Sequence, residues 1–197
     1  MRCFGDGNEL YEHYHDEEWG FPVVQERAVY ERICLEAFQS GLAWITILRK
    51  RDNFRAAFAG FDPEQVAQFG DDDVARLMQD AGIVRNRAKI EATIANARAV
   101  LELRDAGTDV ARLLWSFAPA APAPAAESLS GLPATTPESR ALAKALKRRG
   151  FRFVGPTTAY AAMQACGIVN DHVDGCDTRP LVARARAGAL ASMSATS

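Results

Sequence analysis

Apolar side chains recur along most of the chain at the three- and four-residue intervals of amphipathic helices. In the clearest case Ile90, Ile94, Ala97 and Leu101 fall on one helical face, and Gly107 follows them. Side chains at such intervals share one side of an α-helix, and glycine commonly ends a helix. The pattern predicts a helix that stops at Gly107.

Capping signals predict further helices on both sides of this one. Asp62 and Pro63 form an N-cap and a first helical position, and Thr136 and Pro137 repeat the arrangement. Residues 29–51 are largely apolar and are expected to form one or two helices, broken at the glycine between them. Because β-branched residues are scarce outside short runs, the fold class is expected to be all-α, with about eight or nine helices. The other segments expected to be helical are 71–82, 110–117, 137–147 and 159–169.

Three segments lack a helical pattern. Residues 1–20 are rich in Gly, His and acids, and residues 118–128 alternate Pro and Ala, which predicts an exposed, extended loop. From about residue 181 the chain has no apolar period and is expected to be frayed. We therefore expect one helical domain over residues 1–180, with two lobes that share a core, and a flexible tail over residues 181–197.

The composition is that of a protein with a sizeable core and no membrane segment. Hydrophobic residues make up 48% and charged residues 24% of the 197 residues, which is ordinary globular usage. No stretch approaches the ~20 consecutive apolar residues that span a membrane, and the first residues lack an apolar signal region. A cytoplasmic location without a membrane partner is expected.

The charges are unevenly distributed. The formal net charge is −2, whereas proteins that bind nucleic acid are usually basic. Residues 140–170 nevertheless contain no acid and carry a cluster of bases, namely Arg140, Lys144, Lys147, Arg148, Arg149 and Arg152. A segment of one sign attracts phosphates. The alternative is an ordinary solvated helix face.

The scarce metal-ligating residues gather towards the two ends of the chain. His172 and Cys176 are four residues apart, and Cys3 and His15 are two further candidates from the other end. Two Cys and two His form a closed tetrahedral set typical of structural zinc, which would join these distant segments. The alternative is solvated histidines and reduced thiols. The other two cysteines lie in apolar runs and are expected in the core.

A single carboxylate, Glu36, stands in the otherwise apolar run ICLEAF. On a helix it would either belong to a polar stripe facing water or line a pocket and accept hydrogen bonds from a ligand. Tyr11, Tyr14 and Trp44 supply flat faces on which a base could stack. The alternative for each ring is a place in the core.

The turn GFRFVGPTT is a candidate anion site. Gly155, Pro156 and Thr157 begin a helix whose first amide groups are free to bind a phosphate. Lys147 and Arg149 precede the turn and carry the complementary charge. The alternative is an ordinary connection between two helices.

These residues stand in segments that together resemble the 3-methyladenine DNA glycosylase I family. The segments run in the family's order from Cys3 to Cys176, and only the Pro/Ala loop and the tail fall outside them. They are YHDEEWG, CLEAFQSGLAWITIL, FRAAF, DAGIVRNRAKI, RGFRFVGPT and MQACGIVNDHVDGC. Several long motifs in a fixed order make the resemblance specific.

The resemblance implies a helix-hairpin-helix fold and a role in base-excision repair. The enzyme would be a monomeric, monofunctional glycosylase that flips 3-methyladenine out of double-stranded DNA, hydrolyses its N-glycosidic bond and leaves an abasic site. Gln39 and Leu42 would lie beside the gap left by the extracted nucleotide. GFRFVGPTT would be the hairpin, and the residues expected to contact the DNA backbone there are Gly155, Thr157, Lys147 and Arg149.

Residue roles follow from the same resemblance. Glu36 would be the catalytic residue that reads the edge of the base, with Tyr14 beside it and Tyr11 and Trp44 enclosing the ring. Asp171 would not be catalytic, although its position is similar to that of the catalytic acid of the wider superfamily. One structural Zn²⁺ would be held by Cys3, His15, His172 and Cys176.

The chain departs from the family pattern at one place. The family has a tryptophan shortly after the first cysteine, whereas this chain has CFGDGNE, so either Phe4 replaces it or that wall of the pocket is missing. The irregular segment keeps open an alternative, a zinc-stabilised, non-catalytic module that binds damaged DNA. A zinc hydrolase of small molecules is a second alternative, which four protein ligands disfavour because they leave no open position on the metal.

Overall fold

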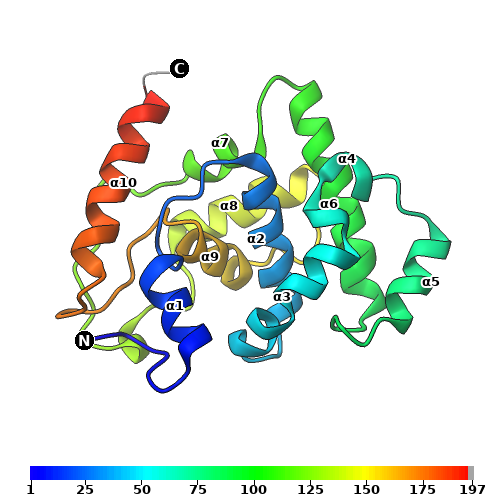
Figure 1. Ribbon diagram of the computed structural model, residues 1–197. Helices are drawn as coiled ribbons and strands as arrows, with labels where there is room; N and C mark the ends of the chain where they lie inside the picture. Colours follow the sequence, from blue (N-terminus) through cyan, green and yellow to red (C-terminus); the bar gives the residue numbers. More distant parts are fainter. Residues whose placement is uncertain (195–197) are drawn as a thin grey trace.

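The computed structural model describes residues 1–194. These residues contain ten α-helices, two short 3₁₀ turns and connecting loops, and no strand occurs among them. The all-α prediction is confirmed for this part of the chain. The helices, labelled as in Figure 1, are α1 (Glu9–Glu17), α2 (Glu26–Gln39), α3 (Trp44–Ala57), α4 (Pro63–Val66), α5 (Asp71–Gln79), α6 (Arg87–Asp105), α7 (Val110–Trp115), α8 (Pro137–Arg148), α9 (Pro156–Ala165) and α10 (Arg179–Ser194), and the 3₁₀ turns are η1 (Ala59–Phe61) and η2 (Leu129–Gly131).

Helix α2 lies at the centre of the molecule (Figure 1) because it is apolar on most sides. It packs against α3, α6, α7 and α9, and its residues Tyr30, Ile33 and Phe38 are fully buried. A helix that is apolar nearly all round is stable only when other helices cover it. The one polar side chain between Ile33 and Phe38 is Glu36, which is thereby carried into the interior.

The capping signals act as predicted. The Asp62 carboxylate accepts a hydrogen bond from the Glu64 amide at 2.9 Å, and the Thr136 hydroxyl accepts one from the Ser139 amide at 3.2 Å. Helices α2 and α3 are separated at Gly41, whose φ of 86° lies in the left-handed region that favours glycine. Residues 118–128 contain no helix, as their Pro/Ala pattern predicts.

Two segments expected to lack regular structure are helical. In the N-terminal segment, Asn8 caps α1 by accepting a hydrogen bond from the Tyr11 amide at 3.1 Å. At the other end, the prediction of a frayed chain from residue 181 is wrong as far as residue 194; residues 195–197 lie outside the described part. Ala and Arg favour helix by propensity alone, and Arg186 anchors α10 by donating to the Gly167 carbonyl at 2.6 Å.

The first residues of the chain and the segment before α10 lie side by side (Figure 1). The Asp177 amide donates a hydrogen bond to the Met1 carbonyl at 3.1 Å. This contact joins residues 176 positions apart in the sequence. Within residues 1–194, no helix is both long enough and apolar enough to cross a membrane.

Candidate active site and metal centre

A cavity of about 240 Å³ opens between the N-terminal segment and helices α1, α2, α3 and α9. Its wall includes all four residues expected to bind a base, since Tyr11 and Tyr14 come from α1, Glu36 from α2 and Trp44 from the start of α3. The full lining is Phe4, Tyr11, Tyr14, Trp19, Glu36, Gln39, Trp44, Leu129, Leu132, Ala161 and Gln164. The volume suits a small, flat ligand.

Aromatic rings form most of the cavity wall. The ring centroids of Tyr14 and Trp44 are 5.3 Å apart, and the Phe4 centroid lies 4.8 Å from Tyr11 and 5.1 Å from Trp19. Phe4, which stands where the resemblance leads one to expect a nearby tryptophan, therefore forms part of the cavity wall. The indole nitrogen of Trp44 is buried and has no hydrogen-bond partner among the described residues, which leaves it free for a ligand.

Glu36 is a carboxyl group in an apolar setting. Only 6% of the residue is exposed, and burial raises the pKa of its carboxyl to about 8, although the positive charge of Arg32 acts in the opposite direction. With a pKa of about 8, the carboxyl is mostly protonated near neutral pH. A cationic ligand beside it would favour the carboxylate, so the group is suited to recognising positive charge.

Arg32 lies one turn before Glu36 on α2 and is held in place by an ion-pair cluster. Its guanidinium donates to Glu18 at 2.7 Å, and Arg51 donates to both carboxylate oxygens of Glu18 at 2.6 and 2.7 Å. Burial alone would raise the pKa of Glu18, but these hydrogen bonds outweigh it and lower the pKa to about 2. The Arg32 guanidinium carbon also lies 5.7 Å from the centre of the Tyr14 ring.

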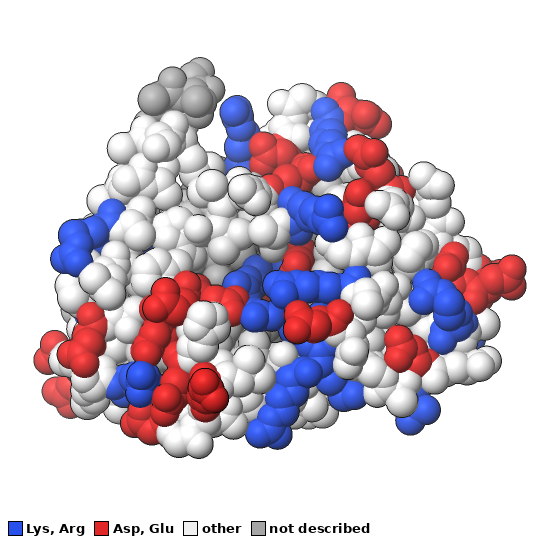
Figure 2. Space-filling model, in the orientation of Figure 1, with Lys and Arg blue, Asp and Glu red and all other residues white. Residues whose placement is uncertain are grey.

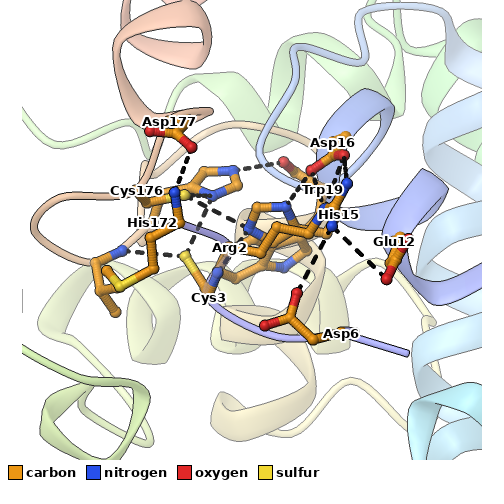
Figure 3. A network of polar contacts seen from close by, with 12 residues as sticks. Arg2, Cys3, Asp6, Glu12, His15, Asp16, Trp19, His172, Cys176 and Asp177 are labelled. Atoms are coloured by element: carbon orange, nitrogen blue, oxygen red, sulfur yellow. Dashed lines mark hydrogen bonds and ion pairs between the residues drawn. The ribbon is translucent and has the colours of Figure 1, made fainter. Parts of the chain in front are cut away.

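Beside this cavity lie four potential metal ligands, and Figure 3 shows their side chains pointing toward one another. The ligand atoms of Cys3, His15, His172 and Cys176 all lie within 4.8 Å of one another. The Cys176 sulfur is 3.5 Å from Nε2 of His15 and 3.4 Å from Nδ1 of His172. Zinc bonds of ~2.3 Å to sulfur and ~2.0 Å to nitrogen give a tetrahedral S···N edge of ~3.5 Å. The residues fit a tetrahedral cation.

The environment of the two histidines suits metal binding. The second ring nitrogen of His15 lies 2.8 Å from the Asp16 carboxylate, and that of His172 lies 2.9 Å from the Trp19 carbonyl oxygen, contacts of the kind that orient metal-bound imidazoles. Burial lowers the pKa of His172 to about 4, so its ring is neutral, and raises the pKa of the Cys3 thiol to about 12. A bound cation would stabilise the thiolate form.

The sequence and the fold both match known proteins. The sequence profile of the methyladenine glycosylase family matches residues 4–179. The chain belongs to the methyladenine glycosylase family. It is 52% identical to DNA-3-methyladenine glycosylase 1 of Escherichia coli over 172 residues, covering 87% of this chain and 92% of that protein. It is 44% identical to DNA-3-methyladenine glycosylase of Haemophilus influenzae, covering 89% of this chain and 96% of that protein.

Solved structures of the family share the fold. A crystal structure of a 3-methyladenine DNA glycosylase I superposes with a TM-score of 0.88 at 50% identity, covering 91% of this chain and all of the other. A structure concerned with 3-methyladenine recognition by the enzyme from Staphylococcus aureus gives 0.85 at 34% identity, covering 90% and 95%. Another structure, with the same TM-score and identity, is a complex with 3-methyladenine and covers 90% and 96%.

In this family member the residues expected to contact DNA surround the turn between α8 and α9. Lys147, Arg149 and Thr157 are exposed, and Gly155 is the N-cap of α9. Since Pro156 has no amide hydrogen, the amides of the first turn are those of Thr157 and Thr158, and no side chain caps them. The Asn96 side chain fixes the turn by two hydrogen bonds to the backbone of Arg152, at 2.7 and 3.3 Å.

The other two residues expected near DNA lie at the end of α2. Gln39 lines the cavity itself, and Leu42, which is 39% exposed, lies in the loop that follows. The ammonium group of buried Lys89 donates hydrogen bonds to the Phe38 and Ser40 carbonyls at 2.9 and 2.7 Å, which holds this loop in position. The loop joins Gln39 to Trp44, which both line the cavity, so it lies at the cavity's edge.

Sequence reasoning missed part of the cavity wall. Leu129 and Leu132 follow the Pro/Ala segment and belong to no periodic pattern, so no signal marked them. Ala161 and Gln164 come from α9. Gln164 did carry a signal, because it is the one polar side chain among the apolar residues of α9 after Tyr160.

Proposed function

We propose that the chain is a monofunctional DNA glycosylase that hydrolyses the N-glycosidic bond of 3-methyladenine in alkylated double-stranded DNA and leaves an abasic site. The observation that carries the proposal is the cavity in which a buried carboxyl group, Glu36, meets several aromatic rings. Relatives named as 3-methyladenine glycosylases support it. We propose that the chain acts as a monomer.

The cavity accounts for selection of the damaged base. The base must leave the duplex to be reached, and extrusion costs a few kcal/mol, less for a damaged base that pairs poorly. Methylation at N3 makes the adenine of the nucleotide cationic. The Glu36 carboxylate favours that charge and accepts hydrogen bonds from the amino edge, while Tyr11, Tyr14 and Trp44 stack on the ring. A cation–π interaction with such rings contributes roughly 0.5–2 kcal/mol.

The reaction needs little acid catalysis, because the cationic base departs as a neutral molecule. The protein has to hold the flipped base, stabilise its charge until the bond breaks, and admit water to the sugar carbon. Glu36 serves the first two tasks as the catalytic residue. No strand cleavage is proposed, since the cavity wall contains no lysine that could form a Schiff base with the sugar.

The metal in this proposal is one structural Zn²⁺ held by two thiolates and two imidazoles. When bound, it would supply a cross-link between the chain's ends and leave no coordination position for substrate. The four residues that would hold it are Cys3, His15, His172 and Cys176.

DNA would be bound by α8, the following turn and α9, acting as a helix-hairpin-helix. The free amides after Gly155 and the Thr157 hydroxyl suit a phosphate, and Lys147 and Arg149 add positive charge. Gln39 and Leu42 would enter the gap left by the nucleotide. Figure 2 shows basic side chains over α3, which continues from that loop, and acidic ones over α1. This separation would favour DNA on the α3 side.

The direct test is base release from methylated duplex DNA. We expect the purified chain to liberate free 3-methyladenine and to leave alkali-labile abasic sites in unbroken strands. Chromatography of released bases, together with gel analysis of the DNA before and after alkali, measures both. A chain that binds the methylated duplex but releases no base would be the non-catalytic module instead.

Replacing Arg32 should shift the pH dependence of base release. Arg32→Met removes a positive charge that lowers the pKa of Glu36, so this pKa rises above its present value of about 8. Because the ionised carboxylate is the active form, the variant should need a higher pH to reach half its maximal rate. Initial rates from pH 6 to 10 measure the shift. Arg32→Lys keeps the positive charge and should show the wild-type pH dependence. Arg55→Met breaks an ion pair with Glu31 and should also show it. The same pH–rate profile for Arg32→Met and Arg55→Met would contradict the role assigned to Arg32.

Replacing Asn96 should weaken DNA binding. Asn96→Ala removes both hydrogen bonds to the Arg152 backbone, which we expect to lower the free energy of unfolding by about 1–3 kcal/mol and to loosen the turn. Affinity for duplex DNA should fall about tenfold, while base release at saturating DNA stays near wild type. Fluorescence anisotropy and urea unfolding measure the two effects. Asn53→Ala, at an exposed site on α3, is the control.

A further inference from the structure

Gln164 introduces a polar group into the cavity from a different helix than Glu36 and Gln39. It lines the cavity from α9, whereas Glu36 comes from α2, and these two helices pack together. The remaining wall is mostly aromatic and aliphatic. A polar side chain in such a wall has a strong influence on which ligands fit.

The orientation of the Gln164 amide is fixed by its partner. Its Nε2 donates a hydrogen bond to Oδ2 of Asp171 at 2.7 Å. The same Oδ2 atom also accepts a hydrogen bond from the Tyr160 hydroxyl, so the amino group of the amide faces an acceptor at Asp171 and the amide oxygen turns away from it. No described donor contacts that oxygen, and it is not sealed from solvent. Gln164 therefore offers an acceptor to the cavity.

Asp171 is itself anchored. It is 8% exposed, and its Oδ2 also accepts a hydrogen bond from the Tyr160 hydroxyl at 2.6 Å. Two donors on one carboxylate oxygen hold the group in a single position. Asp171 directly precedes His172 of the metal group, so the segment that carries it is held at that end. The acceptor in the cavity is thus preorganised.

We propose that Gln164 is a specificity-determining residue whose side-chain oxygen accepts a hydrogen bond from the exocyclic amino group of the base, with Asp171 and Tyr160 as positioning residues. The inference rests on the proposed function. The amino group of adenine has two hydrogens, and Glu36 and Gln164 supply two acceptors for them. Guanine carries a carbonyl oxygen at that ring position. This oxygen would face two acceptors, and no hydrogen would be available to form a hydrogen bond with either of them. The cavity therefore favours 3-methyladenine over 3-methylguanine.

The first test replaces the amide. Gln164→Leu keeps the size of the side chain and removes the acceptor, so kcat/KM for 3-methyladenine should fall about 5- to 10-fold, with little change for 3-methylguanine. Binding of the two free bases, followed by tryptophan fluorescence, should lose the same discrimination. Gln68→Leu, at an exposed glutamine beyond α4, is the control and should keep the wild-type ratio. An unchanged ratio in Gln164→Leu overturns the proposal.

The second test reverses the amide. An asparagine at position 171 can donate to the Gln164 oxygen, which would turn the amino group of Gln164 towards the cavity. Asp171→Asn should therefore lower the ratio of 3-methyladenine to 3-methylguanine release at least as much as Gln164→Leu, whereas Tyr160→Phe lowers it less. Metal content and thermal unfolding show whether each variant is folded. A folded Asp171→Asn with the wild-type ratio excludes the positioning role.

The two proposals fail in different ways. If the wild-type chain releases no base from DNA but binds free 3-methyladenine, the proposed function is wrong and the binding ratio still decides the role of Gln164. If it binds neither free base, the Gln164 proposal falls as well. If it releases and binds both bases equally, only the Gln164 proposal is wrong.

Discussion

Glu36→Gln should lower the rate of 3-methyladenine release about 100- to 1000-fold, the range seen when one preorganised electrostatic group is removed from an active site. Glutamine has nearly the same size, so the cavity stays intact. The negative charge that selects the cationic base is lost, and the side chain gains an amino group that cannot accept hydrogen bonds. Single-turnover release from methylated duplex DNA measures the effect.

The same variant should be more stable than wild type at high pH. Burial raises the pKa of Glu36 from 4.5 to about 8, so the native state binds a proton more tightly than the unfolded state. The resulting stability is present below pH 4.5 and is lost as the pH rises through about 8. Glutamine does not titrate, so Glu36→Gln should melt above wild type at pH 9.

A matched control for both effects is Glu31→Gln, which lies nearer the start of α2 than Glu36 does. Glu31 forms an ion pair with Arg55 at 2.8 Å and does not line the cavity. Its replacement should therefore leave base release unchanged. Wild-type release by Glu36→Gln would remove Glu36 from the mechanism. The same loss in both variants would point to a general defect of the helix.

Cys176→Ala should destabilise the whole chain. Without one of its four ligands the metal group should bind zinc far more weakly, and the tie between the chain's ends is lost. We expect the free energy of unfolding to fall by roughly 4 kcal/mol, which lowers the melting temperature by about 10 °C. Metal analysis and calorimetry measure the two quantities. Removing zinc from the wild-type chain with a chelator should give the same melting temperature.

The control is another buried cysteine. Cys34→Ala removes a core thiol that is not part of the metal group, so zinc content should stay at one per chain while stability falls only slightly. A chelated protein that keeps its melting temperature but stops turning over would indicate a catalytic metal. A Cys176→Ala variant that keeps zinc and stability would show that the group is not a zinc site.

Much of the fold could be predicted because local signals agree with the packing. The caps at Asp62 and Thr136 and the period of α6 report on backbone geometry that neighbours in sequence determine. Helix α10 was missed because its stability comes from propensity and from Arg186, whose carbonyl partners lie beyond α9. Tertiary contacts of that kind leave no periodic pattern.

The candidate site divides in the same way. Glu36 was marked by its apolar neighbours, and the metal residues by their scarcity at two ends of the chain. The Asp171–Gln164 contact joins two elements, and only the structure shows which way the amide points. Leu129 and Leu132 enter the cavity through a loop whose path no local rule specifies.

Phe4 and Trp19 connect the metal group to the cavity. Each ring lines the cavity and also contacts a histidine of the metal group, with centroids 4.9 Å apart for Phe4 and His15 and 4.6 Å for Trp19 and His172. A deletion of residues 1–4 would therefore remove a ligand and part of the aromatic wall together. Shortened or tagged versions of this protein should be made with that N-terminal segment left intact.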